Sequence, residues 1–202
     1  MAFNIFRRGS EPDPDTAARV PPGQYITQKW PVLHYGSVPK VSRETWSLRV
    51  FGLIGRDQFA LSWADLLAFP QATITEDIHC VTTWTRLGAQ FQGVSFGEIL
   101  ALAQPHPEAT HVMIHGEHNY TTNLALTDLV QPNVLIAHQA DGKELEPDHG
   151  GPVRLVVPHL YFWKSAKWLN GIEFMDHDRP GFWESYGYHM RGDPWAEERY
   201  SD

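Results

Sequence analysis

The chain contains very little cysteine: Cys80 is the only one among 202 residues. A single cysteine cannot form a disulfide within the chain, so the small secreted scaffolds that depend on disulfides are excluded. One thiol is compatible with a reducing compartment, and we expect a cytoplasmic protein. No run of about 18 apolar residues is present either, which predicts no membrane insertion.

Positive charge is also scarce. Sixteen Lys and Arg residues against 24 Asp and Glu residues give a net charge of −8. Proteins that bind nucleic acid or anionic membranes need basic patches, so we expect no nucleic-acid partner. A twin arginine, Arg7-Arg8, is followed by acidic residues and prolines instead of an apolar stretch. We therefore read no export signal there.

The length fits one domain that can bury a substantial core. Residues 1–24 are polar and rich in proline, which predicts a flexible or surface-draped leader, and residues 25–202 form the domain. Eight Trp, seven Tyr and ten Phe are typical of a β-rich core, or of a pocket for a flat cofactor.

Strands are predicted to outnumber helices. Short runs rich in β-branched residues predict strands at 46–52, 72–80, 111–116, 133–139, 153–158 and 171–175. Helix start signals occur at Ser62 and Ser95, each with an acidic residue three positions later, and at Thr127. Because the helices follow no regular βαβ rhythm, the predicted fold class is α+β with mixed or antiparallel sheets.

Cys80 ends one predicted strand and precedes a polar, aromatic segment that reads as a loop. Buried cysteine often serves as a small hydrophobe, which is one interpretation. A nucleophilic role is disfavoured, because the adjacent His79 points to the opposite strand face. Zinc binding is disfavoured by the spacing of the histidines at 111, 115 and 118. A fourth role is the thiolate ligand of a soft metal held mainly by an organic cofactor.

The segment 149–169, "HGGPVRLVVPHLYFWKSAKWL", supplies what an anionic cofactor needs. Gly150 and Gly151 allow close approach of a ligand to the backbone. Arg154 can bind a phosphate with two hydrogen bonds, and Lys164 and Lys167 add positive charge. The alternative is a core strand with a solvated arginine, followed by a surface loop with two lysines.

This segment, together with "HCVTTW" at residues 79–84, resembles the molybdopterin-binding domain of the sulfite oxidase family. That family includes the catalytic subunit of periplasmic methionine sulfoxide reductase. The resemblance implies a mixed, β-rich α+β fold and a molybdenum-molybdopterin cofactor. It also implies oxygen-atom transfer to or from a small-molecule substrate, with electrons exchanged with a separate electron-transfer partner.

The resemblance assigns roles to individual residues. Cys80 would be the molybdenum ligand. The residues that match cofactor-holding positions are His34, Tyr35, His149, Arg154, Lys164, Ser165 and Lys167. Trp84, Tyr161 and His138 are candidates to line the substrate side, with core packing as the alternative for each.

Two departures from the family pattern concern the substrate. Leu33 stands in the segment where sulfite oxidases carry an arginine, and His138 stands where they carry a tyrosine. Arg86 could supply an anion contact instead. These differences keep open a reductase of S-oxides or N-oxides, and a non-catalytic molybdopterin-binding carrier.

Overall fold

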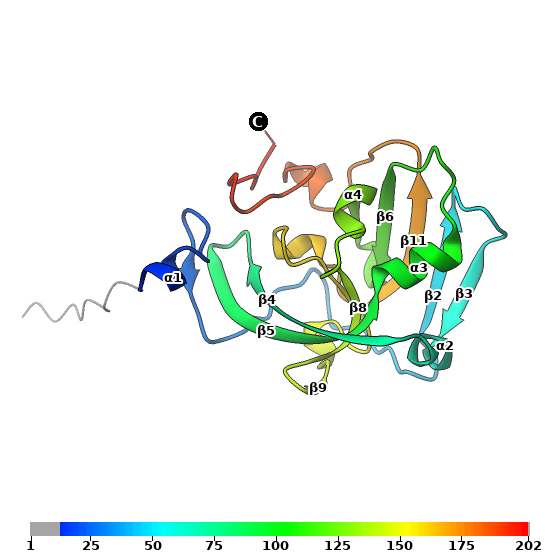
Figure 1. Ribbon diagram of the computed structural model, residues 1–202, viewed down its shortest axis with the longest axis horizontal. Coiled ribbons are helices and arrows are strands. Elements are labelled where there is room, and N and C mark those ends of the chain that lie inside the picture. The colour runs from blue at the N-terminus through cyan, green and yellow to red at the C-terminus, as the bar shows by residue number, and fades with distance from the viewer. Residues whose placement is uncertain (1–12, 202) are drawn as a thin grey trace, which may run out of the picture.

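The computed structural model describes residues 13–201, and its strands form two sheets (Figure 1). The first has the order β1-β5-β8-β10, with β4 added on β5 and β9 on β8. The second has the order β3-β2-β11-β6-β7. The strands are β1 (Tyr25–Ile26), β2 (Ser47–Gly52), β3 (Phe59–Ser62), β4 (Gln71–His79), β5 (Trp84–Ser95), β6 (His111–Gly116), β7 (Thr121–Ala125), β8 (Leu135–Ala140), β9 (Lys143–Glu144), β10 (Arg154–Val156) and β11 (Leu169–Met175).

Both sheets are mixed, which confirms the predicted fold class. β11 pairs in parallel with β2 and antiparallel with β6, while β1 pairs in parallel with β5. Alternation in β2 buries Leu48 and Val50 and exposes the residues between them. The interior strand β6 instead buries Val112, Met113 and Ile114 in succession, as expected for a strand covered on both faces.

The four α-helices are short: α1 (Pro14–Ala17), α2 (Trp63–Ala68), α3 (Phe96–Ala103) and α4 (Leu126–Leu129). At α2 the predicted start at Ser62 is confirmed, and Ser62 forms a capping box with Asp65; a capping box was predicted at Ser95 with Glu98. At α3 Ser95 caps through the amide of Gly97, so the predicted box with Glu98 was wrong. Thr127 lies inside α4 and is not its cap, which is Ala125.

Four 3₁₀ turns lie within residues 13–201: η1 (Glu117–Asn119), η2 (Pro147–His149), η3 (Phe162–Lys164) and η4 (Glu184–Tyr186).

The predicted loop after Cys80 was wrong. It is instead a turn of four residues followed by β5, the longest strand described, which pairs with β4 and β8. Gly88 adopts a φ of 63° and Gly93 lies at a register shift, so two glycines interrupt the strand pattern in the sequence. The long β4–β5 hairpin runs along the lower part of Figure 1.

The terminal segments lie over the end of this hairpin. Arg7-Arg8 and the rest of residues 1–12 fall outside the described residues. The remainder of the predicted leader holds α1, and Arg19 pairs with Asp77 of β4 at 2.6 Å. No helix in residues 13–201 has the length and apolar character needed to cross a membrane.

Candidate active site

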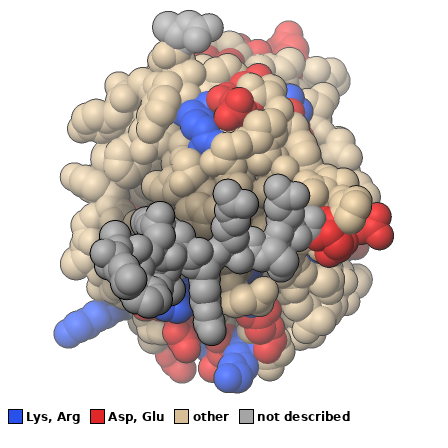
Figure 2. Space-filling model, turned by 90° about the vertical axis from the view of Figure 1, so that its left-hand side faces the viewer, with Lys and Arg blue, Asp and Glu red and all other residues tan. Residues whose placement is uncertain are grey.

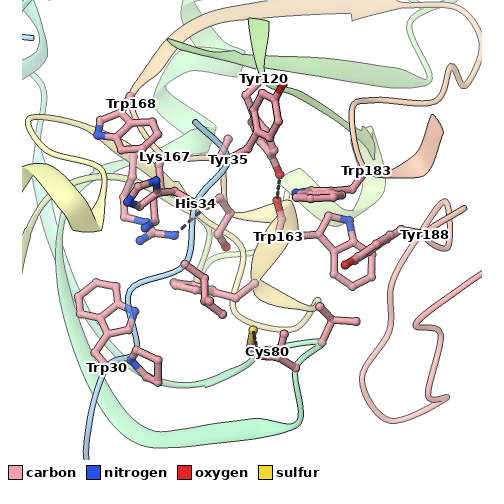
Figure 3. Close-up of a pocket in the computed structure, with 18 of the residues that line it drawn as sticks. Trp30, His34, Tyr35, Cys80, Tyr120, Trp163, Lys167, Trp168, Trp183 and Tyr188 are labelled. Atoms are coloured by element: carbon pink, nitrogen blue, oxygen red, sulfur yellow. Dashed lines mark hydrogen bonds between the residues drawn. The ribbon is translucent and has the colours of Figure 1, made fainter. Parts of the chain in front are cut away.

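A cavity of about 350 Å³ lies where the β4–β5 turn, η3 and the segment before β2 meet (Figure 3). Its walls are mainly aromatic. Trp163, Trp183 and Tyr188 stand on one side, and Trp30 and Trp168 on the other. Of the residues predicted from the sequence, seven line it: His34, Tyr35, Cys80, Trp84, Arg154, Ser165 and Lys167.

The Cys80 side chain is buried and lies on the cavity wall. Its Sγ lies 3.1 Å from the Thr82 hydroxyl. Burial raises the pKa of the thiol, against the lowering effects of the Thr82 hydrogen bonds and the positive charges of Arg199 and Lys167. A coordinated metal deprotonates such a thiol, so the site can offer a thiolate to a cation.

Lys167, predicted from the sequence to hold the cofactor phosphate, lines the cavity. Its Nζ donates to the carbonyl oxygen of Asp148 at 2.5 Å. Burial and the neighbouring charge of Arg154 lower the pKa of Lys167 to about 7. An anion in the cavity would favour the charged ammonium, since opposite charges stabilise each other.

Arg154 is buried, lines the cavity and bonds to the backbone of two segments that border it. Its guanidinium donates to the backbone carbonyls of His149 at 2.8 Å and of Ser165 at 2.8 Å. It also lies 4.3 Å from the ring centroid of Phe162. Burial lowers the pKa of Arg154 to about 9. Arg154 therefore fixes the two segments that border the cavity while presenting positive charge to it.

Two buried nitrogen atoms next to the cavity have no hydrogen-bond partner among residues 13–201: Trp84 Nε1 and His149 Nδ1. Trp84 lines the cavity, whereas His149 stacks on the cavity-lining Trp30 with ring centroids 4.0 Å apart. Buried polar atoms are normally paired, so such atoms mark places where a ligand can bind. One thiol, two cations and an unpaired indole N–H fit an anionic cofactor that also brings a metal.

Lys164, predicted as a phosphate contact, does not line this cavity. Its ammonium is fully buried in an ion pair with Glu184 at 2.6 Å. It also donates to the backbone carbonyls of Asn123 and Met190. Because Glu184 accepts a hydrogen bond from Trp163 Nε1 at 2.8 Å, Lys164 supports the aromatic wall indirectly.

His138, predicted on the substrate side, does not line this cavity. In the pairing of β5 with β8, Gln92 lies opposite Gln139 and Gly93 opposite Ala137, so His138 is the extra residue of a β-bulge. Its Nε2 lies 2.9 Å from the side chain of Gln71, and its ring packs on Trp63. Both partners are outside the cavity lining.

Tyr161 and Arg86 also lie behind the cavity wall and not on it. Tyr161 is fully buried and stacks on Trp163. Arg86 pairs with Asp141 at 2.5 Å, so its charge is already compensated.

Sequence reasoning missed most of the aromatic lining. The additional residues are Trp30, Pro31, Leu33, Val81, Thr82, Tyr120, Phe162, Trp163, Ala166, Trp168, Trp183 and Tyr188. Leu33 had been singled out only as a departure from the family pattern. The high tryptophan count was the available signal, since five of the eight tryptophans line this one cavity.

Comparisons with known proteins identify the family of the chain. The family model described as the oxidoreductase molybdopterin binding domain matches residues 35–183. The chain is 48% identical to the uncharacterized oxidoreductase YuiH of Bacillus subtilis, over 93% of this chain and 94% of that protein. It is 29% identical to the protein-methionine-sulfoxide reductase catalytic subunit MsrP of Gluconobacter oxydans, over 74% of this chain and 54% of MsrP.

A solved structure shows the same fold. The sulfane dehydrogenase SoxCD from Paracoccus pantotrophus superimposes with a TM-score of 0.66 and 19% sequence identity. The match covers 88% of this chain and 56% of the SoxCD chain.

Proposed function

The chain belongs to the oxidoreductase molybdopterin-binding domain family, and we propose that it transfers an oxygen atom to or from a small uncharged substrate. In the reducing direction, an S-oxide or N-oxide takes up two electrons and two protons and gives the reduced compound and water. The electrons come from a separate one-electron carrier. Molybdopterin-bound molybdenum supplies the redox chemistry.

The observation that carries the proposal is the shared position of Cys80 and Lys167 on one aromatic cavity. We assign Cys80 as the thiolate ligand of the metal. Lys167 and the Trp84 indole N–H are placed to hold the anionic part of the cofactor. Arg154 and Ser165 keep the cavity border in position through the backbone: Arg154 bonds the Ser165 carbonyl, and Ser165 Oγ accepts from the amide of Val157 at 2.9 Å.

The walls of the cavity favour an uncharged substrate. The two cationic side chains that line it are not free for a substrate, because Arg154 is bonded to backbone carbonyls and Lys167 is assigned to the cofactor. Leu33 is half exposed at the cavity, where the family resemblance places a sulfite-binding arginine. A dianion such as sulfite would lose its hydration there without gaining a free cation, which is costly.

A substrate panel in both redox directions tests this proposal. With reduced viologen as donor, the holoprotein should turn over sulfoxides or amine N-oxides. With ferricyanide as acceptor, sulfite should be oxidised with a much lower kcat/KM. The Leu33→Arg variant should lower the KM for sulfite, while the uncharged control Leu33→Met should not. A wild-type preference for sulfite over every neutral oxide would reject the uncharged-substrate proposal.

The role of Cys80 has its own test. Serine is nearly isosteric with cysteine, so the Cys80→Ser variant should fold, with a loss of stability of no more than about 2 kcal/mol. Turnover should fall by more than about 100-fold, since even residues that only orient a metal ligand contribute that much. Thermal unfolding checks the fold, and the Mo(V) electron paramagnetic resonance spectrum checks the metal. A wild-type spectrum and full turnover in this variant would exclude the thiolate role.

A further inference from the structure

The turn that carries Cys80, residues 80–83, is held by both terminal segments of the described chain. Gln24 Nε2 donates to the Cys80 carbonyl at 3.1 Å, and the Tyr25 amide donates to the Thr83 carbonyl at 2.8 Å. From the other end, Arg199 Nη1 donates to the Val81 carbonyl at 2.7 Å. Three of the four carbonyl groups in the turn are therefore bonded by residues distant in sequence.

The turn contains a residue in a strained conformation. Thr83 adopts a φ of 74°, a conformation unfavourable for a β-branched residue. Within the hairpin, the Thr83 amide donates to the Cys80 carbonyl and the Cys80 amide to the Trp84 carbonyl. Strained conformations persist only where the surroundings impose them, so the external contacts matter here.

Arg199 connects several parts of the site. Its second terminal nitrogen lies 3.4 Å from the Pro22 carbonyl, and its guanidinium lies 5.0 Å from the ring centroid of Tyr161. The neighbouring Tyr200 forms an antiparallel bridge with the cavity-lining Tyr188, which fixes the backbone of this segment. Arg199 thus joins the N-terminal segment, the C-terminal segment and the Cys80 turn.

We propose that Arg199 and Gln24 are positioning residues that hold the Cys80 sulfur at a fixed place on the cavity wall. This rests on the proposed role of Cys80 as the metal ligand. Neither residue lines the cavity. Both act on the turn backbone, through the carbonyls of Cys80 and Val81.

The first test measures metal retention in the holoprotein. Arg199→Met and Gln24→Met keep the size of the side chain but remove the donor. We expect each to weaken molybdenum retention by about 10- to 100-fold, the range for residues that orient a metal ligand. Arg199→Lys, which keeps the charge and a donor, should recover part of the loss. The control is Arg179→Met, since Arg179 is an exposed arginine paired with Glu173 on the surface.

The second test uses the single cysteine as a probe of the turn. In full-length protein produced without cofactor, Cys80 should react slowly with iodoacetamide because it is 8% exposed. Arg199→Met and Gln24→Met should raise the alkylation rate at temperatures well below unfolding, and Arg179→Met should not.

The outcomes separate the two ideas. Wild-type alkylation rates and wild-type molybdenum retention in both variants would overturn the positioning role. Faster alkylation with unchanged retention, together with retention in Cys80→Ser, would confirm that the turn is held but reject Cys80 as the metal ligand.

Discussion

At the scale of single residues, burial decides which groups of the site carry charge. The same low-polarity surroundings raise the pKa of the Cys80 thiol and lower that of the Lys167 ammonium. Without a bound anion and metal, both shifts favour the neutral forms. In the proposed site, a bound anionic cofactor and its metal would restore both charges together.

His79, next to Cys80, gives a prediction for pH dependence. Burial lowers the pKa of His79 to about 4, and its Nδ1 lies 2.9 Å from the Thr85 hydroxyl. Because the folded pKa lies below the unfolded value of 6.5, the unfolded chain binds more protons between pH 6.5 and pH 4. Stability from this group is complete above pH 6.5 and falls by about 3 kcal/mol as the pH drops toward 4.

Urea unfolding across this range checks the prediction. The His79→Gln variant should lose less stability than the wild type between pH 7 and pH 4.5, since glutamine has no proton to bind. Carboxylates that do not interact with His79 contribute equally in both proteins and cancel in the comparison, whereas Asp77, whose pKa the His79 charge lowers, belongs to the measured difference. Parallel curves for the two proteins would show that His79 does not titrate in this way.

At the scale of elements, Gly93 allows β5 and β8 to approach each other. A Cβ atom added at Gly93 would lie 2.6 Å from the Cα of Ala137 and would also meet the Ile136 carbonyl. Both neighbours are backbone atoms and cannot move aside. Gly93→Ala should therefore cost about 3 kcal/mol of unfolding free energy, measured by chemical denaturation.

Gly88 provides the matched control in the same strand. It has a φ of 63°, and an added Cβ would meet nothing within 4 Å. Asparagine tolerates this left-handed conformation better than most residues, so Gly88→Asn should cost no more than about 1 kcal/mol. Equal losses in the two variants would mean that strand propensity, and not the close approach to β8, limits substitution at Gly93.

Helices and strands with a clear pattern in their own residues could be predicted from the sequence. Apolar and polar residues alternate along the predicted strand 46–52, and Ser62 with Asp65 marks the start of α2. β5 was missed because its two glycines serve contacts with other strands: the Gly88 amide donates to Asp77 of β4, and Gly93 lies against Ala137 of β8. The same holds for His138, whose direction is set by a bulge that appears only when β5 and β8 are paired.

Among the site residues, those in compact sequence motifs could be predicted, and those placed by contacts distant in sequence could not. Cys80 and Lys167 belong to compact motifs, and the structure brings them to one cavity. Lys164, three residues before Lys167, ends the turn η3 and points to the opposite side, which sequence spacing did not reveal. The Arg199 contact with Val81 joins residues 118 positions apart and has no local sequence signal.

At the scale of the whole molecule, the net charge affects which electron carriers the protein attracts. The net charge is −8. On the face shown in Figure 2, small groups of acidic side chains stand apart on a mostly uncharged surface. A long-range negative potential attracts cations at low ionic strength and is screened as salt is added. We therefore expect the carrier to present a basic face.

Artificial one-electron acceptors of opposite charge test this expectation. For hexaammineruthenium(III), a cation, the kcat/KM should fall by about tenfold between low and high salt, within the range known for electrostatic steering. For ferricyanide, an anion, it should rise over the same range, because screening reduces repulsion. An uncharged quinone serves as the control and should respond little. The same direction of change for both charged acceptors would mean that the net charge does not govern encounter, and a carrier with a basic face would lose its support.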